Sequence, residues 1–134
     1  MGQRIVVDTN ILISALGWRG LEHKLLNECF SGKHTLCLSI QILHELIKVM
    51  DYPKFKFTQA QKDLYLSLLQ AHSLILDIPE FLENVCEDKT DIKFIECAVK
   101  HNAAYLISGD QHLLKLKNFN GIPIIKVSEF YSGL

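Results

Sequence analysis

Two aspartates stand just after short apolar stretches of the sequence. Asp8 follows residues 5–7 (Ile-Val-Val), and Asp110 closely follows residues 104–107. Each stretch is typical of a buried strand, so each aspartate marks the place where a strand ends. In parallel sheets ligands bind beyond these ends. Two carboxylates brought together there repel each other, and they persist most easily with a cation between them.

Two further acids extend this set. Glu45 lies in a helical pattern after the second predicted strand, and Asp91 opens a helix with apolar residues at 94, 95, 98 and 99. Other interpretations stay open. Asp8 and Asp110 can each cap the helix that follows. Glu45 lies opposite the apolar stripe of its helix, where a solvated acid is common. Asp91 suits the dipole at a helix start, and the neighbouring Asp88 serves equally as functional acid or cap.

Alternating strands and helices must position these acids. We expect strands at residues 3–8, 35–38, 73–78, 104–108 and 122–127. Helices are expected at 10–16 and 21–30, from a Ser39 cap to Met50, from a Thr58 cap to His72, and up to Asn102 and Leu116. This order predicts an α/β protein with a central parallel sheet of about five strands and helices on both faces. Leu64, Leu68 and Ala71 are expected on the inner face of the fourth helix.

Composition narrows the class of protein. The chain has 134 residues, 49% of them hydrophobic, and a net charge of −1, which fits one domain spanning residues 1–134. The longest apolar run has five residues, so we expect no membrane span. Asp8 interrupts any signal-peptide pattern, so we expect a cytoplasmic protein with reduced cysteines. The lysines are uneven: residues 48–62 hold four of them and one acid.

At this point the residues resemble a known family. Residues 6–10 (Val-Val-Asp-Thr-Asn) resemble the opening motif of the PIN domain nucleases, and the spacing from Ser39 to Glu45 is similar to their second motif. Residues 88–98 and 104–114 resemble the stretches that carry their third and fourth acids. The resemblance covers nearly the whole chain in order. It is strongest for the short bacterial and archaeal members that act as VapC-like toxins in toxin–antitoxin pairs.

The resemblance implies a PIN-like three-layer fold and cleavage of single-stranded RNA with Mg²⁺ or Mn²⁺. Asp8 and Asp110 would bind the metal directly, Asp91 partly through water, and Glu45 would hold a second metal or the attacking water. Supporting positions are Thr9, Asn10, Ser108 and Asp88. The sequence departs from the family at Ile92, where relatives often carry a second Asp. This departure favours Asp91 as the third acid and leaves Asp88 as the alternative nearby.

Four acids repel a phosphodiester, so we expect a basic rim around them. The candidates for RNA binding are Lys89, Lys93, Lys115, Lys117, Arg19 and Trp18. Trp18 would stack on an unpaired base, although partial burial against the sheet edge explains it slightly better. The lysines are equally consistent with ordinary solvated surface. The family resemblance also implies a homodimer and a possible antitoxin protein as partners. We expect Leu66 and Leu69 of the fourth helix to form a second buried face at the dimer contact.

Two other classes of function remain. A non-catalytic PIN-like RNA-binding module would keep the fold but lose acids, and here all four are present. A phosphatase-like α/β phosphotransferase also places an Asp after its first strand. The dehalogenase type of phosphatase needs a second Asp two residues later, where this chain has Asn10. A nuclease, a phosphodiester hydrolase, is therefore the interpretation that the sequence favours.

Overall fold

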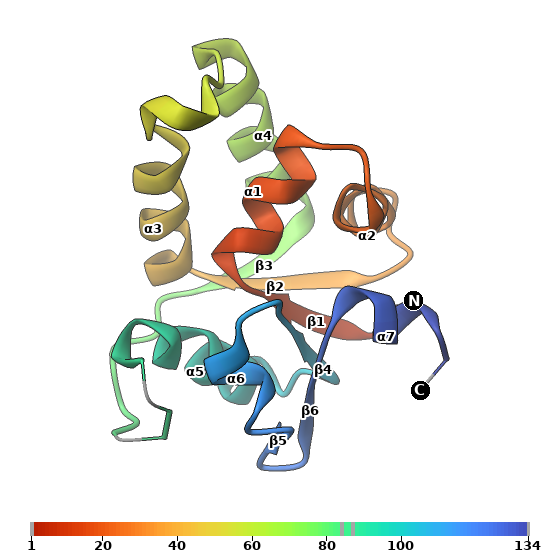
Figure 1. Ribbon diagram of the computed structural model, residues 1–134, viewed down its shortest axis with the longest axis vertical. Helices are drawn as coiled ribbons and strands as arrows, with labels where there is room; N and C mark the ends of the chain where they lie inside the picture. Colours follow the sequence, from red (N-terminus) through yellow and green to blue (C-terminus); the bar gives the residue numbers. More distant parts are fainter. Residues whose placement is uncertain (1, 84, 87, 134) are drawn as a thin grey trace.

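A six-stranded sheet runs through the centre of the protein (Figure 1). The computed structural model describes residues 2–83, 85–86 and 88–133. The strand order is β3-β2-β1-β4-β6-β5, and every pair is parallel except β5 with β6. The predicted parallel sheet is confirmed, and the short β5 is the strand that its pattern did not reveal. The strands are β1 (Arg4–Val7), β2 (Thr35–Ser39), β3 (Ser73–Leu76), β4 (Tyr105–Ile107), β5 (Asn118–Phe119) and β6 (Ile122–Ile125).

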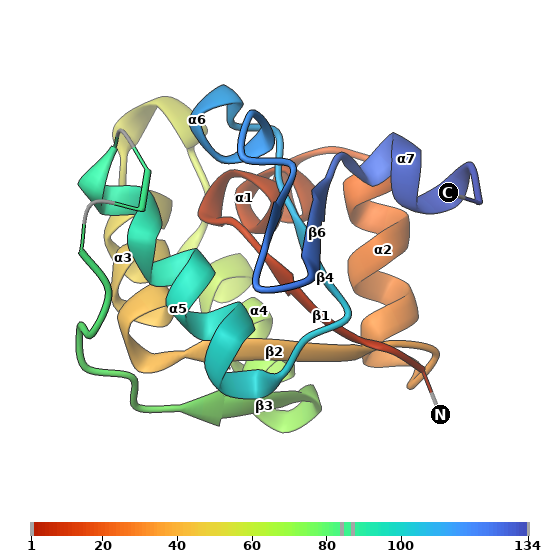
Figure 2. The ribbon, with the colours of Figure 1, turned by 90° about the horizontal axis from the view of Figure 1, so that it is seen from below.

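Helices cover both faces of the sheet. Figures 1 and 2 show α1 to α4 gathered on one face and α5 on the other. Right-handed crossovers explain this, because the chain moves from β1 to β3 in one direction and then returns to β4 in the other. The helices are α1 (Thr9–Gly17), α2 (Leu21–Phe30), α3 (Ile40–Met50), α4 (Gln59–His72), α5 (Ile92–His101), α6 (Gln111–Leu114) and α7 (Val127–Tyr131), with 3₁₀ turns η1 (Pro53–Phe55) and η2 (Lys89–Asp91).

Two helix starts follow the predicted caps. The Ser39 hydroxyl accepts a hydrogen bond from the Ile42 N–H at 3.1 Å, and α3 begins directly after it. Thr58 and Gln61 form a reciprocal capping box at the start of α4. Such side chains satisfy backbone donors that a helix start leaves free, so these boundaries are set locally.

The core lies between the sheet and both helix layers. Ile5, Val6 and Val7 of β1 are completely buried, as expected for a central strand covered on both faces. The predicted inner face of α4 is wrong by one position. Tyr65 and Leu69 are its buried residues, whereas Leu64 is exposed. The phenol of Tyr65 donates to the Leu12 carbonyl at 2.7 Å, which rotates α4 toward α1.

This rotation also removes the structural argument for the homodimer. Leu69 is fully buried within its own chain and Leu66 packs against the same core, so neither supplies a second apolar face. Two other expectations concern membrane insertion and disulfide bonds. Among the described residues, no helix is both long and apolar enough to cross a membrane. All four cysteines are free thiols.

Candidate active site

Asp8 and Asp110 lie where the strand order changes direction. β1 pairs with β2 on one side and with β4 on the other, so a crevice opens beyond the ends of β1 and β4. Asp8 caps α1, accepting from the Ile11 N–H at 2.9 Å, and Asp110 caps α6, accepting from the His112 N–H at 2.7 Å. The capping interpretation is therefore correct for both residues. It also explains how the chain aims both carboxylates at the crevice.

Ser108 joins these two acids. Its hydroxyl donates to Asp8 Oδ2 at 2.5 Å and accepts from the Asp110 N–H at 2.9 Å. The Gly109 N–H adds a weaker contact to the same Asp8 oxygen at 3.3 Å. Burial raises the pKa of Asp8; the bonds from Ser108 and the backbone oppose that shift, and the Asp110 charge adds to it. Ser108 thus holds the first acid in a fixed orientation.

Asp91 is the least compensated of the four acids. It is 7% exposed, forms no capping hydrogen bond at the start of α5, and its Oδ2 atom is buried without a hydrogen-bond partner. Its pKa is raised to about 6, first by burial and then by the charges of Asp110, Asp88 and Asp8, whereas the Lys93 charge opposes this shift. A buried carboxylate oxygen without a partner is costly, so this atom calls for a cation or proton.

Asp88, rather than Asp91, forms the side-chain capping bonds in this segment, at the start of η2. Its carboxylate accepts from both the N–H and the hydroxyl of Thr90, at 2.9 and 2.7 Å. These bonds lower its pKa, the hydroxyl bond contributing most. The two residues therefore differ in their contacts: Asp88 secures η2, and Asp91 is left without such partners.

Glu45 reaches the crevice from α3. Its Oε1 atom accepts a hydrogen bond from the Thr9 hydroxyl, and its Oε2 atom lies 2.8 Å from the Lys93 ammonium. Lys93 also donates to the Thr90 carbonyl. Glu45 is thus held by residues from α1 and α5 rather than being a freely solvated acid.

All four acids line one pocket of about 190 Å³. Sequence reasoning missed three of its other residues: Val49, Thr90 and Phe94. Helical spacing contained the signal for two of them, because Val49 lies four residues after Glu45 and Phe94 three after Asp91, which places each pair on one helix face. The remaining lining residues are Thr9, Asn10 and Asp88.

The segment that leads to the third acid is anchored from both helix layers. Buried Glu96 on α5 accepts from the N–H groups of Phe81 and Leu82, at 2.6 and 2.9 Å. Gln41 on α3 accepts from the Ile78 N–H at 3.1 Å. These side chains replace sheet partners for a segment that leaves β3, and they bring η2 to the crevice.

The pocket suits a hard divalent cation in its donors and its charge. It is built from carboxylate oxygens, the donors that Mg²⁺ and Mn²⁺ prefer, and Asp91 carries an uncompensated buried oxygen. The arrangement is not ready-made: in the described part of the chain, no three His, Cys, Asp or Glu side chains form a group that could hold a metal. The Lys93 ion pair and the Asp110 cap draw two of the acids to other partners, which side-chain rotation would release.

Comparison with known proteins identifies the family of this chain. The family model described as PIN domain matches residues 4–112. The chain belongs to the PIN domain family. An uncharacterized protein of Methanocaldococcus jannaschii is 34% identical over 120 residues, covering 87% of this chain and 77% of that protein. One chain of the crystal structure of VapBC2 from Rickettsia felis, bound to a DNA fragment from their promoter, has a TM-score of 0.60 at 18% identity, covering 90% of this chain and 96% of that chain.

PIN domains are generally nucleases and typically use divalent metals, which places this chain among the hydrolases of nucleic acids. The likeness to the VapBC2 chain concerns the fold alone. It spans nearly all of both chains, so the two share the sheet and its helix layers rather than a local motif.

The predicted rim of this PIN domain separates into different environments. Lys93 forms an ion pair with Glu45, so it neutralises an acid of the pocket and is no free rim cation. Lys89 is exposed on η2, and Lys115 and Lys117 follow α6. Trp18 and Arg19 are exposed beyond α1, so the expected burial of Trp18 against the sheet edge is wrong.

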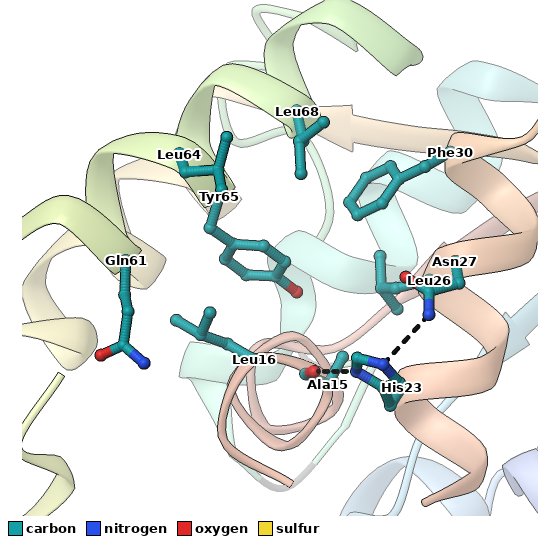
Figure 3. A pocket seen from close by; sticks show the side chains of 10 residues that line it. All are labelled: Ala15, Leu16, His23, Leu26, Asn27, Phe30, Gln61, Leu64, Tyr65 and Leu68. Atoms are coloured by element: carbon teal, nitrogen blue, oxygen red, sulfur yellow. Dashed lines mark hydrogen bonds between the residues drawn. The ribbon is translucent and has the colours of Figure 1, made fainter. Parts of the chain in front are cut away.

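A second pocket of this PIN domain has the opposite character. It opens between α1, α2 and α4 and is lined mostly by aliphatic and aromatic side chains (Figure 3). Its polar groups are engaged: His23 contacts the Ala15 carbonyl and Asn27, each at 3.0 Å. An exposed Leu64 stands at its margin. Such a groove suits an apolar segment of another molecule rather than hydrolysis.

Proposed function

We propose that this PIN domain is a divalent-metal-dependent endoribonuclease that cleaves single-stranded RNA. The observation that carries the proposal is the pocket lined by Asp8, Glu45, Asp91 and Asp110, in which Asp91 keeps a buried oxygen without a partner. These acids come from four separate parts of the chain. Capping or solvation explains single acids, but neither explains why four meet at one sheet edge.

Each residue has a defined task in this proposal. Asp8, Asp91 and Asp110 would hold Mg²⁺ or Mn²⁺, and Glu45 would hold the attacking water or a second cation. The bound cation supplies an acidified water and neutralises charge on the phosphodiester. Ser108 and Thr9 keep Asp8 and Glu45 in place by hydrogen bonds. Asn10 lies exposed at the edge of the pocket, and Asp88 keeps η2 folded.

The direct test is cleavage by purified protein. An unstructured RNA of about twenty nucleotides, incubated with Mn²⁺, should yield internal fragments, and EDTA should prevent their formation. A duplex of the same sequence should be cut more slowly. RNA binding without fragments at any Mn²⁺ concentration would favour the non-catalytic module. Phosphate release from a small phosphomonoester would instead favour the phosphotransferase.

We further propose a toxin that acts in the cytoplasm and is controlled by an antitoxin protein. Support comes from the fold shared with a VapBC2 chain and from the apolar groove between α1, α2 and α4. We assign that groove to an apolar segment of the antitoxin, because an open patch of this kind is typical of a protein contact.

The product of a short reading frame beside this gene provides the test. Co-expressed with this protein, it should co-purify and suppress RNA cleavage. Leu64→Asp should release it, because a charge would enter the groove. Leu74→Asp, at another exposed leucine, on β3, should leave the complex intact. Equal effects of both substitutions would contradict the groove assignment. The homodimer stays a prediction, which light scattering at micromolar concentration tests.

A further inference from the structure

Four aromatic side chains gather beyond the far ends of α1 and α3. We call this group the aromatic shelf: Trp18, Tyr52, Phe55 and Phe57. Tyr52 and Phe55 are stacked with 6.5 Å between ring centroids, and Phe55 and Phe57 with 5.5 Å. Trp18 meets Phe55 edge-on at 6.4 Å. Three nearly parallel rings thus lie in one row, with the indole beside the central ring.

The shelf has an inner and an outer part. Phe55 and Phe57 pack against the hydrophobic core, and Phe57 lies so close to Gly17 that a Cβ there would stand 3.3 Å from the ring. Trp18 and Tyr52 are 58% and 42% exposed. The inner rings explain how the turn docks on α1, whereas the outer rings stay exposed to solvent. A large exposed aromatic pair of this kind is typical of a binding surface.

The backbone of the shelf is built at a cost. Lys56, between the two inner rings, has a φ of 55°, a left-handed conformation that disfavours residues other than glycine by about 1 kcal/mol or more. This conformation ends η1 and lets residues 55 and 57 stack on each other. Unusual backbone held by its surroundings is often found where a surface has a function.

The shelf continues the two helices that form the acid pocket. α1 starts beside Asp8 at the pocket and ends at Gly17, one residue before Trp18. Val49 of α3 lines the pocket, and the Tyr52 N–H donates to its carbonyl at 3.0 Å. Figure 1 shows α1 and α3 leaving the sheet on the same side, with the turn of the shelf at their far end. Nine helical residues span about 13 Å, which matches about three or four stacked nucleotides.

The charge around the shelf is positive. The Lys54 ammonium lies 5.1 Å from the centre of the Phe55 ring, and Lys48 and Lys56 are exposed nearby in sequence. Lys62 is paired with Asp51 at 2.6 Å, which removes the one acid of this segment as a source of repulsion. Arg19 is exposed beside Trp18. Exposed rings surrounded by cations suit a ligand that carries both negative charges and flat groups, as a nucleic acid does. They suit an apolar protein surface with few acids less well.

We propose that the aromatic shelf binds unpaired bases of the RNA that enters the acid pocket, with Trp18 and Tyr52 stacking on bases and Lys54 facing the backbone. This inference rests on the proposed function for the identity of the ligand. It makes the shelf a substrate-binding site separated from the cleavage site by about one helix length. It also gives a structural reason for a single-strand preference, because bases within a duplex are already stacked on each other.

The chain has a single tryptophan, so intrinsic fluorescence reports from the shelf itself. Titration with an oligouridylate of twelve nucleotides, in EDTA to prevent cleavage, should quench Trp18 in a saturable way. A three-nucleotide oligomer and a duplex should bind more weakly. Tyr52→Ala should weaken binding roughly five- to 150-fold, the range for loss of one base–aromatic stack.

Phe81→Leu is the matched control. Phe81 is 42% exposed and has the Lys100 ammonium 4.7 Å from its ring, so it copies the chemistry of the shelf at another place. The affinity of the Phe81→Leu variant for the oligouridylate should stay within twofold of that of the parent protein. Trp18→Leu, followed with labelled RNA, should behave as Tyr52→Ala, whereas Trp18→Phe should retain most of the affinity. Thermal melts of every variant establish that the fold is retained.

The outcomes separate this inference from the proposed function. Quenching and a loss with Tyr52→Ala, but no cleavage with Mn²⁺, would retain the shelf and overturn the nuclease. Cleavage with a KM unchanged by Tyr52→Ala and Trp18→Leu would overturn the shelf and retain the nuclease. A change of oligomeric state in these variants, without a change in RNA affinity, would assign the shelf to a protein contact and also overturn the inference.

Discussion

The carboxylate of Glu28 and the carboxylates of the acid pocket differ in how well their charges are compensated by neighbouring groups. Glu28 on α2 receives the Tyr131 hydroxyl at 2.6 Å, His34 Nε2 at 2.8 Å and the Lys33 ammonium at 3.3 Å. Partial burial alone would raise its pKa, but these three partners outweigh burial and lower it to about 2. In the acid pocket the balance is reversed, since burial and neighbouring carboxylates raise the pKa of Asp8 and Asp91.

The difference distinguishes a structural acid from a functional one. Glu28 joins α2 to the C-terminal α7 and to the segment before β2, so its charge stabilises the fold. The pocket acids gather like charges beside a buried oxygen without a partner, which weakens the metal-free fold. A metal site without its cation is expected to destabilise the fold in this way.

Removal of a pocket acid should show the largest effect. Asp8→Asn deletes a ligand while retaining the Ile11 cap, so RNA cleavage should fall at least about a hundred-fold. The melting temperature should stay the same or rise, because one repulsive charge is lost. Gel-based cleavage and thermal melts measure both. Cleavage at the parental rate would rule out Asp8 as a ligand.

The same replacement of a carboxylate by an amide at Glu28 should have the opposite effects on stability and on cleavage. Glu28→Gln weakens charged hydrogen bonds, so it should destabilise the fold by about 1–2 kcal/mol and lower the melting temperature by several degrees. Because the pKa of Glu28 is lowered, this contribution is present above its ordinary value of 4.5 and is lost as pH falls toward 2. Denaturant unfolding at pH 7 and pH 3 gives the comparison, with RNA cleavage at pH 7 unchanged. A constant difference between the two pH values would contradict this account.

Asp91→Asn should stabilise the metal-free protein in a pH-dependent way. With its pKa raised from 3.8 to about 6, Asp91 destabilises the fold increasingly as pH rises through this interval. In EDTA the variant should therefore match the parent below pH 3.8 and exceed it above pH 6, by about 1 kcal/mol once solvent screening is included. Chemical unfolding across this range measures the difference. A variant less stable than the parent at pH 7 would reverse the assigned sign.

Lys93→Met should have the smallest effect. The partly exposed pair with Glu45 contributes about 0.5 kcal/mol or less. Its loss leaves the pocket more negative, so the Mn²⁺ concentration for half-maximal cleavage should fall about two- to threefold while the KM for RNA rises. Lys100→Met on the same helix is the control and should change neither. Weaker Mn²⁺ dependence in both variants would show an effect of net charge alone.

Some parts of the sheet and of the pocket could be predicted from the sequence, and others could not. The apolar runs at residues 5–7 and 105–107 each end near an Asp, and parallel topology requires those ends to meet, so Asp8 and Asp110 were predictable as neighbours. The two residues of β5 form too short a segment for any periodicity to appear. The inner face of α4 was displaced because Tyr65, a residue with a polar tip, reaches a carbonyl on α1.

The finer geometry of the site depended on contacts between distant segments. The sequence favoured Asp91 over Asp88 as the third acid, but it did not show that the Asp88 carboxylate accepts a hydrogen bond from the Thr90 hydroxyl. Lys93 looked like a rim residue because its partner, Glu45, lies far away in sequence. The shelf was represented by Trp18 alone, since Tyr52 and Phe55 join it only through the turn after α3.

The most direct test of the account is the shift in melting temperature produced by millimolar Mn²⁺. A cation bound only by the folded protein stabilises it by mass action. Mn²⁺ should therefore raise the melting temperature of the parent and of Glu28→Gln by the same amount, and that of Asp8→Asn by much less. Equal shifts in all three proteins would contradict a metal site at the acid pocket.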